Sequence, residues 1–383
     1  MYNASAAFHQ AVADGEPQIA MLIFYDAVFT NEDIDVTAGL QFNEYFNLEE
    51  DIAIGQALSN ELSFTLFNDE RLLNDYKFGE FIATLGVLIN TSTYVQTDGV
   101  KIETKYGTWV GTDVYPYVKK NGSAVSSQPS FPVRSIMCYN ERVFVFADDG
   151  RCDVYDDSTA TNVTQFSPRP GAFMKNKVKG WNGRGFFYRD DTRILYIYDS
   201  GTKYTYEFVP LGKFIAERPK APDTIQISMT CNDFMTKFDE DMPSASSLGF
   251  SYPVTFKKLL EKICDKVDVD LATTSFINSG AKLNSKPKAF DNATMRDVIK
   301  WIAEAAGSNA RFNRDGKLVL DWIHSSSVSM SANDYETFDP YWYQTKKVEK
   351  LNNRASDGSY EKTKGSGKET YLIQDNPLLK GVS

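Results

Sequence analysis

The sequence contains few of the side chains on which most metal sites and nucleophilic enzymes depend. Its 383 residues include two histidines, His9 and His324, and four cysteines without any Cys-x-x-Cys spacing. Zinc sites need clustered Cys and His ligands, and a disulfide framework needs regularly spaced cysteines. We therefore expect no metal and no cofactor. We expect scattered buried thiols at the cysteine positions, which are Cys138, Cys152, Cys231 and Cys264.

Long apolar runs and an excess of positive charge are also lacking. No segment approaches the ~18 consecutive apolar residues of a membrane span. Residues 1–15 show no basic stretch followed by an apolar core, so we predict no secretory signal and assembly in a cytoplasm. The 41 Lys and Arg against 51 Asp and Glu give a net charge of −10. Specific nucleic-acid binding is disfavoured because phosphate contacts need clustered Lys and Arg, although DNA could pass through such a protein.

Aromatic residues, in contrast, are abundant and favour β structure. The chain has 26 Phe and 21 Tyr, residue types that fit pleated, half-buried surfaces. A short capped helix is predicted between Ser5 and Gly15. Apolar or alternating runs then predict strands at Ile19–Tyr25, Glu61–Phe67 and Phe81–Ile89. We assign residues 1–94 and 205–235 to a first tube-like β domain.

Residues 95–204 have a different texture and contain a weak internal repeat. Arg142–Arg151 matches Arg184–Arg193, an offset of 42 residues, and each copy leads into a Tyr-Asp pair, at Tyr155-Asp156 and Tyr198-Asp199. The offset lies in the ~40–45-residue period of propeller blades, but two copies cannot close a propeller. We interpret this region as a separable β-rich insertion built from two similar sheets. Two coincidentally similar hairpins fit the sequence equally well.

Two helices and a hairpin are predicted in the next region, residues 236–325. Apolar residues from Phe256 to Val267 recur at helical spacing. Thr294 and Asp297 form a capping box for a second helix, which ends at Gly307. Asp315-Gly316 predicts a two-residue type I′ turn. This gives an α+β middle domain, followed by a second tube-like β region at 326–383, in which residues 352–368 read as a solvated loop between strands.

The order of these elements resembles the tail hub family of bacteriophages, which includes the baseplate hub of contractile tails and the tail-tip protein of long non-contractile tails. The resemblance covers roughly residues 1–95 and 205–383 and leaves the insertion uncovered. No single motif is specific, and the weight lies in their order. The segments that carry it are Asn43–Gly55, Ser59–Phe64, Leu211–Phe214, Asn232–Asp239, Phe276–Asn278, Thr294–Asp297, Arg311–Leu318 and Asp375–Leu379.

This resemblance implies a structural virion protein that is not an enzyme. The fold implied is α+β and mainly β, with two barrel-like tube domains, a helical-hairpin middle domain and the β-rich insertion. Three subunits would form a pseudo-hexameric ring that continues the tail tube. The implied partners are further copies of the chain, the neighbouring tube ring, and a spike, fibre or tape-measure protein. Genomic DNA would only pass through, and we expect an acidic or neutral channel wall.

A carbohydrate-binding or peptidoglycan-degrading module is the alternative, because tail-tip proteins often carry one. Exposed aromatic rings stack on sugars, and the insertion supplies candidate contacts at Trp109, Trp181, Tyr188 and Tyr196. A glycosidase needs two carboxylates across a cleft. Acidic residues such as Asp148, Asp149, Asp153, Asp156 and Asp157 fit turns between strands better. Neither histidine adjoins a Gly-x-Ser-x-Gly elbow. Burial of the aromatic rings would favour core packing over sugar binding.

Overall fold

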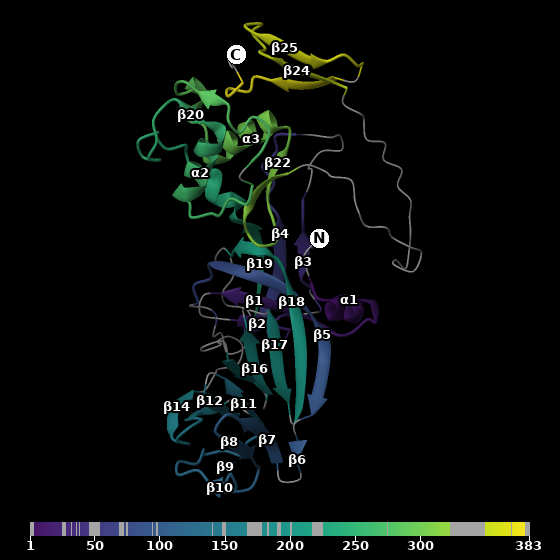
Figure 1. Cartoon of the computed structure of the whole chain (residues 1–383), viewed down its shortest axis with the longest axis vertical. Coiled ribbons are helices and arrows are strands. Elements are labelled where there is room, and N and C mark those ends of the chain that lie inside the picture. Colours follow the sequence, from purple (N-terminus) through teal and green to yellow (C-terminus); the bar gives the residue numbers. More distant parts are fainter. Residues whose placement is uncertain are drawn as a thin grey trace. The chain divides into compact units, whose positions relative to one another are not determined.

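The computed structural model shows an α+β chain that is mainly β, which confirms the predicted class. It divides into two compact units, Met1–Gln41 with Ser63–Cys231, and Phe42–Leu62 with Asn232–Ser383 (Figure 1). None of the sheets in the described part of the chain closes into a barrel. The residues described are 4–24, 28–31, 33–35, 37, 39–45, 54–68, 73, 76–93, 95–96, 99–139, 141–147, 151–166, 178–181, 184–189, 193–199, 201–216, 225–273, 275–321, 349–368 and 370–379.

The first unit begins with helix α1, Ala6–Ala13, close to the predicted position. The Ser5 side chain accepts a hydrogen bond from the backbone N–H of Phe8 at 3.1 Å, and Gly15 follows the helix with a φ of +72°. Phe8 and Ala11 are buried against Val87 and Val209 of the main sheet. Helix α1 therefore covers one face of that sheet.

The main sheet joins segments from both sides of the insertion. Strands β5 and β18 are antiparallel along their whole length, with Thr93 opposite Thr202. The chain thus leaves the sheet at the end of β5, and the last strands of the insertion, within residues 178–199, rejoin it beside β18. The sheet has the order β15-β16-β17-β18-β19-β4-β3, and β18 also pairs with β5, β5 with β1, and β1 with β2. The strands outside the insertion are β1 Gln18–Phe24, β2 Val28–Thr30, β3 Gln41–Asn43, β4 Glu61–Phe67, β5 Glu80–Thr93, β18 Thr202–Ile215 and β19 Gln226–Asp233.

Phenylalanine rings fill the centre of this sheet. Phe24 stacks on Phe81 with ring centroids 4.6 Å apart, and Phe64 meets Phe81 edge-on at 5.7 Å. After β2, Ile34 forms an isolated antiparallel bridge with Leu66 of β4, so the chain that follows β2 reaches the other end of the sheet. The ladder is interrupted there, so strand pairing does not complete a barrel, and the barrel-like form stays a prediction.

The insertion consists of antiparallel sheets stacked face to face on the main sheet (Figure 1). Its first sheet has the order β10-β9-β8-β7-β6, and the second has the order β11-β12-β13-β14. Strands β15, β16 and β17 extend the main sheet from β18. The bounds are β6 Val95–Gln96, β7 Gly99–Thr104, β8 Gly107–Gly111, β9 Val118–Lys120, β10 Ser123–Ala124, β11 Ser135–Tyr139, β12 Arg142–Phe146, β13 Cys152–Asp156, β14 Asn162–Phe166, β15 Val178–Trp181, β16 Arg184–Arg189 and β17 Ile194–Asp199.

The alternation of strand β12 explains this stacking. Val143 and Val145 pack with Trp109 in the core against the first sheet. Phe144 and Phe146, on the opposite face, belong to a second core beside the main sheet, with Tyr196 and Tyr198 of β17 packed against it. A strand buried on both faces needs apolar residues at every position. The outer face of the first sheet is polar, with Lys101 paired to Glu103 at 2.7 Å, and this polarity ends the stack.

The two copies of the sequence repeat form equivalent hairpins. β12 pairs with β13, and β16 pairs with β17, both antiparallel. Each hairpin carries the same cross-strand ion pair at its open end, between Arg142 and Asp156 at 2.6 Å and between Arg184 and Asp199 at 3.3 Å. The repeat therefore has a counterpart in two hairpins with the same ion pair. The two hairpins lie in different sheets, the four-stranded sheet of the insertion and the main sheet, so the expected pair of similar sheets is not found.

The second copy of the repeat packs into the main β domain, which differs from the expectation that residues 95–204 form a separable unit. Phe186, Leu195 and Ile197 share a buried core with Ile19 and Met21. Residues 184–197 are therefore packed into the domain on which the insertion was expected to sit as an independent body. Among the described residues, 95–166 are the part of the insertion whose sheets pair only among themselves.

The second unit contains the two predicted helices, α2 Phe256–Lys266 and α3 Met295–Ala306. The predicted stripes are buried, as Leu259, Leu260 and Ile263 in α2 show. The capping box of Thr294 and Asp297 is present, and Gly307 ends α3 in the left-handed conformation. Short elements complete this region: η2 Phe234–Asp239, β20 Val254–Thr255, β21 Lys282–Leu283 and η3 Lys288–Asn292.

The predicted type I′ turn at Asp315-Gly316 is wrong in detail. Strands β22 Asn309–Phe312 and β23 Leu318–Asp321 pair with Phe312 opposite Leu318, which leaves a longer loop. Only Gly316 has positive φ, whereas type I′ requires positive φ at both central residues. The Asn313 side chain accepts hydrogen bonds from the N–H groups of Asp315 and Lys317, at 3.1 and 3.0 Å. This side chain sets the loop that is found.

The predicted loop at 352–368 is also wrong in part. β24 Lys350–Arg354 and β25 Glu361–Gly365 form a hairpin, and β26 Thr370–Gln374 lies parallel to β24. Every residue of β25 is exposed, so its side chains lack the apolar alternation that identifies a strand.

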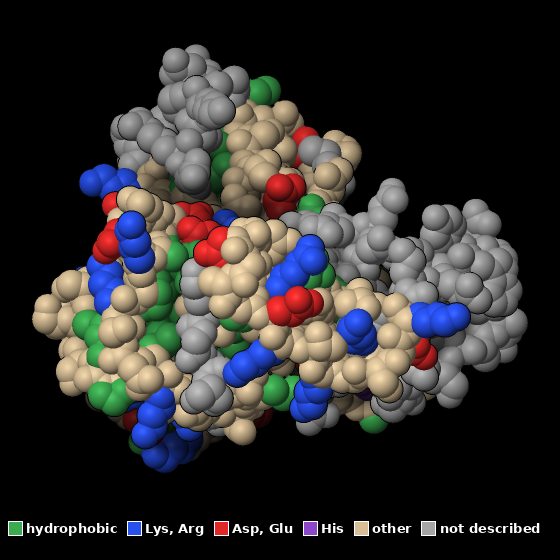
Figure 2. Space-filling view, turned by 90° about the horizontal axis from the view of Figure 1, so that it is seen from above, with side chains coloured by type: hydrophobic (Ala, Val, Ile, Leu, Met, Phe, Trp, Pro, Cys, Tyr) green, Lys and Arg blue, Asp and Glu red, His purple; other side chains and the backbone are tan. Residues whose placement is uncertain are grey.

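Figure 2 shows acidic and basic side chains interspersed on the face seen from above.

Candidate functional site

A polar cluster in the insertion ties its first two sheets together, and we call it the polar joint: Thr104, Trp109, Lys120, Cys138 and Asp157. Asp157 follows β13 and is 1% exposed. Its Oδ1 accepts hydrogen bonds from Trp109 Nε1 at 2.7 Å and Thr104 Oγ1 at 2.8 Å. The carboxylate of the second sheet is therefore bound by side chains of the first.

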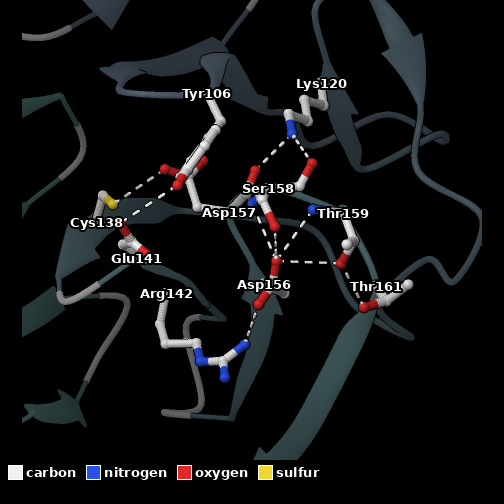
Figure 3. Close-up of polar contacts among 10 residues, drawn as sticks. All are labelled: Tyr106, Lys120, Cys138, Glu141, Arg142, Asp156, Asp157, Ser158, Thr159 and Thr161. Carbon is white, nitrogen blue, oxygen red and sulfur yellow. Dashed lines mark hydrogen bonds and ion pairs between the residues drawn. The ribbon is translucent and has the colours of Figure 1, made fainter.

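Lysine 120 reaches the same joint from β9 (Figure 3). Its Nζ donates to the carbonyl oxygens of Asp157 at 2.5 Å and Ser158 at 2.9 Å, and lies 5.4 Å from the centroid of the Trp109 ring. Lys120 of the first sheet therefore binds the backbone that carries the Asp157 side chain. The lysine thus completes the link between the sheets.

The neighbouring Asp156 organises the turn between β13 and β14 (Figure 3). Its Oδ1 accepts hydrogen bonds from both the backbone and the side chains of Ser158 and Thr159, between 2.6 and 3.1 Å. Arg142 donates to Oδ2 at 2.6 Å. The hydrogen bonds from Ser158 and Thr159 hold the pKa of the Asp156 carboxyl far below its ordinary value. Asp156 is therefore a structural anion.

The chemistry available at the joint is limited. Burial, together with the nearby Asp157 carboxylate, raises the pKa of the Cys138 thiol to about 11, so it stays protonated and poorly nucleophilic. The carboxylate oxygens of Asp156 and Asp157 accept hydrogen bonds from other residues of the chain. The two carboxylates do not face each other across a cleft. No cluster of metal-ligating side chains occurs among the described residues. Asp148, Asp149 and His324 lie outside the described part of the chain.

Of the four predicted sugar contacts, the structure describes the side chains of Trp109 and Tyr196. Trp109 is fully buried, which favours core packing for this residue. Tyr196 is half-buried, and the Nζ of Lys203 lies 4.2 Å from its ring centroid. Trp181 lies in β15 and Tyr188 in β16, and their side chains are outside the described part of the structure.

Sequence reasoning missed a loop that exposes apolar side chains, which we call the tyrosine loop: Thr112–Tyr117, between β8 and β9. Val114 is 71% exposed and Tyr115 is 69% exposed. Tyr115 meets Tyr117 edge-on with centroids 5.7 Å apart. The signal available in the sequence is a Val-Tyr-Pro-Tyr run between two short strands, where a polar turn is the ordinary choice.

In the second unit, Asp233 is a buried carboxyl with a structural role. It accepts hydrogen bonds from the N–H groups of Asn60 at 2.8 Å and Met235 at 3.0 Å, and from Ser59 Oγ at 3.0 Å. Burial raises its pKa to about 6. Because the carboxyl caps η2 and fixes residues 59 and 60, its oxygens are occupied within the fold.

A groove of about 510 Å³ in the second unit is lined by residues 282–285 and 287–289, together with Asp375, Pro377 and Leu378. Its acidic member, Asp375, accepts a hydrogen bond from the backbone N–H of Ser356 at 2.8 Å, which lowers the pKa of this carboxyl. The groove thus presents no poised acid or base. No helix in the described residues has the length and apolar character needed to cross a membrane.

Comparison with known proteins gives limited matches. No family model matches the chain. A Saccharomyces cerevisiae protein, RHO1 GDP-GTP exchange protein 2, is 28% identical over an alignment that spans 33% of this chain and 9% of that protein. The chain thus matches under a tenth of the length of this relative. The structure is similar to the prophage MuSo2 43 kDa tail protein from Shewanella oneidensis, with a TM-score of 0.30, 9% identity, and coverage of 94% of this chain and 68% of that one.

Proposed function

We propose that this chain is a structural hub of a bacteriophage tail tip or baseplate. Three copies would form a pseudo-hexameric ring that continues the tail tube and connects it to a distal spike or fibre. The proposal rests on the order of sequence segments that resemble the tail hub family, and the fold supplies one observation that supports it.

That observation is the way in which the insertion interrupts the main sheet. The resemblance stops near residue 95 and resumes near residue 205. In the structure, Thr93 at the end of β5 lies opposite Thr202 at the start of β18. The segments before and after the insertion thus form one continuous antiparallel pair. The hub interpretation requires that the segments on the two sides of the insertion belong to one β domain.

We further propose that the protein is not an enzyme and uses no cofactor. The supporting observation is that Asp156, Asp157 and Asp233 are held by hydrogen bonds from their own fold. Partners would be further copies of the chain, the adjoining tube ring, and a spike, fibre or tape-measure protein. The protein would reside in the virion after assembly in the bacterial cytoplasm. DNA would pass through the ring without specific binding, along an acidic or neutral wall.

Native mass spectrometry of the purified chain tests the ring. The expected species is a homotrimer that persists on dilution, because obligate interfaces are large and apolar. A ring of six copies, or a monomer at every concentration, would contradict the proposal. Counting copies in purified particles gives an independent measurement, with about three per tail expected.

The alternative, a carbohydrate-binding or peptidoglycan-degrading module, remains a proposal for the insertion. Its predicted contact at Trp109 is buried, so an exposed ring elsewhere in the insertion would have to serve. The tyrosine loop provides such a ring.

A further inference from the structure

The tyrosine loop is held in one conformation by its own polar contacts. The N–H of Thr112 donates to the carbonyl of Tyr117 at 2.8 Å, and Thr112 Oγ1 donates to the carbonyls of Val114 at 2.6 Å and Pro116 at 3.2 Å. The carbonyl of Thr112 accepts from the N–H of Val133 at 3.0 Å. Thr112 itself is buried, so it anchors the exposed tip from below. An ordered loop loses little conformational entropy on binding.

The tip presents one free aromatic surface. Tyr117 contacts the Tyr115 ring edge-on, an arrangement that leaves much of the Tyr115 ring in solvent. Within the described residues, neither the Tyr115 hydroxyl nor the exposed Asp113 carboxylate makes a hydrogen bond. An exposed aromatic ring with its hydroxyl therefore lies two residues along the chain from an exposed carboxylate.

The size and polarity of this tip favour a saccharide over a protein. A stable protein interface buries about 800 Å² on each partner. The exposed apolar side chains here are only Val114 and Tyr115, among polar neighbours such as Asp113. A sugar ring can bind both the Tyr115 ring and the Asp113 carboxylate. Its C–H edges stack on the negative face of an aromatic ring. Its hydroxyls suit the carboxylate.

We propose that the tyrosine loop is a saccharide-binding site, with Tyr115 as the stacking platform and Asp113 as a hydrogen-bond acceptor for sugar hydroxyls. The ligand class is a neutral or cationic glycan of a bacterial surface. This site differs from the four aromatic positions expected from the sequence. The site requires neither a trimer nor a tail, so its test is independent of the test of the hub proposal.

The test is binding of the full-length chain to an array of bacterial surface glycans and peptidoglycan fragments, with titration of the best hit by calorimetry. We expect Y115A to weaken binding by about tenfold or more, the effect of losing one aromatic contact. Y115W keeps a stacking face and should retain binding. D113N should weaken binding less than Y115A because it keeps an acceptor oxygen.

I225A is the matched control, because Ile225 is 74% exposed and lies in the same unit. Removing it changes exposed apolar area without touching the loop, so binding should be unchanged. Thermal melting of each variant checks that it folds. We expect every variant to fold, because the side chains of Asp113, Tyr115 and Ile225 are all exposed. Equal binding by Y115A and the wild type would overturn the proposal. So would the absence of any bound glycan, including a result in which the wild type self-associates through the loop.

Discussion

At the residue scale, Asp156 and Asp157 show how two adjacent carboxylates acquire different roles. Asp157 points into the joint between two sheets, where Trp109 and Thr104 donate to it. Asp156 points back over its own turn, where Ser158 and Thr159 donate. Strand alternation sends adjacent side chains to opposite faces. Both residues stabilise the insertion, one between sheets and one within a turn.

Loss of the Asp157 carboxylate should destabilise the insertion. D157A leaves the buried Trp109 Nε1 donor without its acceptor, which costs about 2 kcal/mol. The half-buried Thr104 hydroxyl loses one acceptor but keeps the Gly107 carbonyl at 2.9 Å. Urea unfolding should show this loss, and hydrogen exchange should place it in β7, β8 and β9. D157N keeps one acceptor and should lose less. D113A removes an exposed carboxylate from the same sheet and should stay within about 0.5 kcal/mol. Unchanged stability of D157A would contradict the role of the joint.

The Asp156 carboxylate should make stability depend on pH in the acid range. Its pKa in the folded chain lies below the value of about 3.9 for an unfolded aspartate. The folded state therefore binds fewer protons, so this stabilisation is complete above about pH 4 and is lost as the pH falls further.

Melting temperatures of the wild type and D156N, measured from pH 7 to pH 2.5, test this dependence. The wild type should melt higher than D156N at pH 5 to 7, and the gap should narrow below about pH 4. D113N, which removes an exposed carboxylate, should match the wild type throughout. A gap that does not change with pH would show that Asp156 acts through shape alone.

At the element scale, the end of α3 depends on the backbone conformation of one glycine. Gly307 has a φ of +65° and no atoms within 4 Å of a Cβ built there. An alanine would therefore meet only the cost of the left-handed conformation, about 1 kcal/mol. Gly280 is equally open but has no positive φ.

The pair G307A and G280A isolates the cost of the left-handed backbone, because an added Cβ would meet no atom within 4 Å at either position. Urea unfolding should show a loss of about 1 kcal/mol for G307A and a change within about 0.5 kcal/mol for G280A. Equal effects of the two substitutions would mean that the helix end does not require the left-handed residue.

The elements that sequence patterns predicted well are those whose burial is periodic. Leu259, Leu260 and Ile263 of α2 lie buried where expected, as do Leu62, Phe64 and Leu66 of β4. Val267, the last residue of the predicted α2 run, follows the helix and is half-buried. The hairpin of β24 and β25 was missed because its exposed side chains carry no periodic signal. The Asp315-Gly316 loop was predicted with the wrong turn because the Asn313 side chain, a local competitor for backbone donors, sets its geometry.

At the scale of the whole molecule, we expect the insertion to be removable only in part. Deleting residues 99–166 and joining the ends through a ~15-residue Gly-Ser linker leaves the core of Phe186, Leu195 and Ile197 with Ile19 and Met21 intact. The shortened chain should be soluble and melt cooperatively. Deleting residues 99–199 exposes the partners of that core, and the product should aggregate.

Size-exclusion chromatography and thermal melting of the two deletions distinguish these outcomes. If both deletions fold equally well, then β16 and β17 contribute nothing essential to the main sheet. If neither folds, the first two sheets of the insertion are needed by the rest of the unit.

The sequence by itself determined the mainly β class, the order of α1, β1, β4, β5, α2 and α3, and the likeness between residues 142–151 and 184–193. These follow from local periodicity and capping, which neighbouring residues encode. Only the tertiary structure decided that Trp109 is a core residue, that Asp157 joins two sheets, and that Tyr115 is exposed. Periodicity indicates that a strand has an apolar face, but not which distant sheet covers it. That partner is set by packing between segments far apart in the chain.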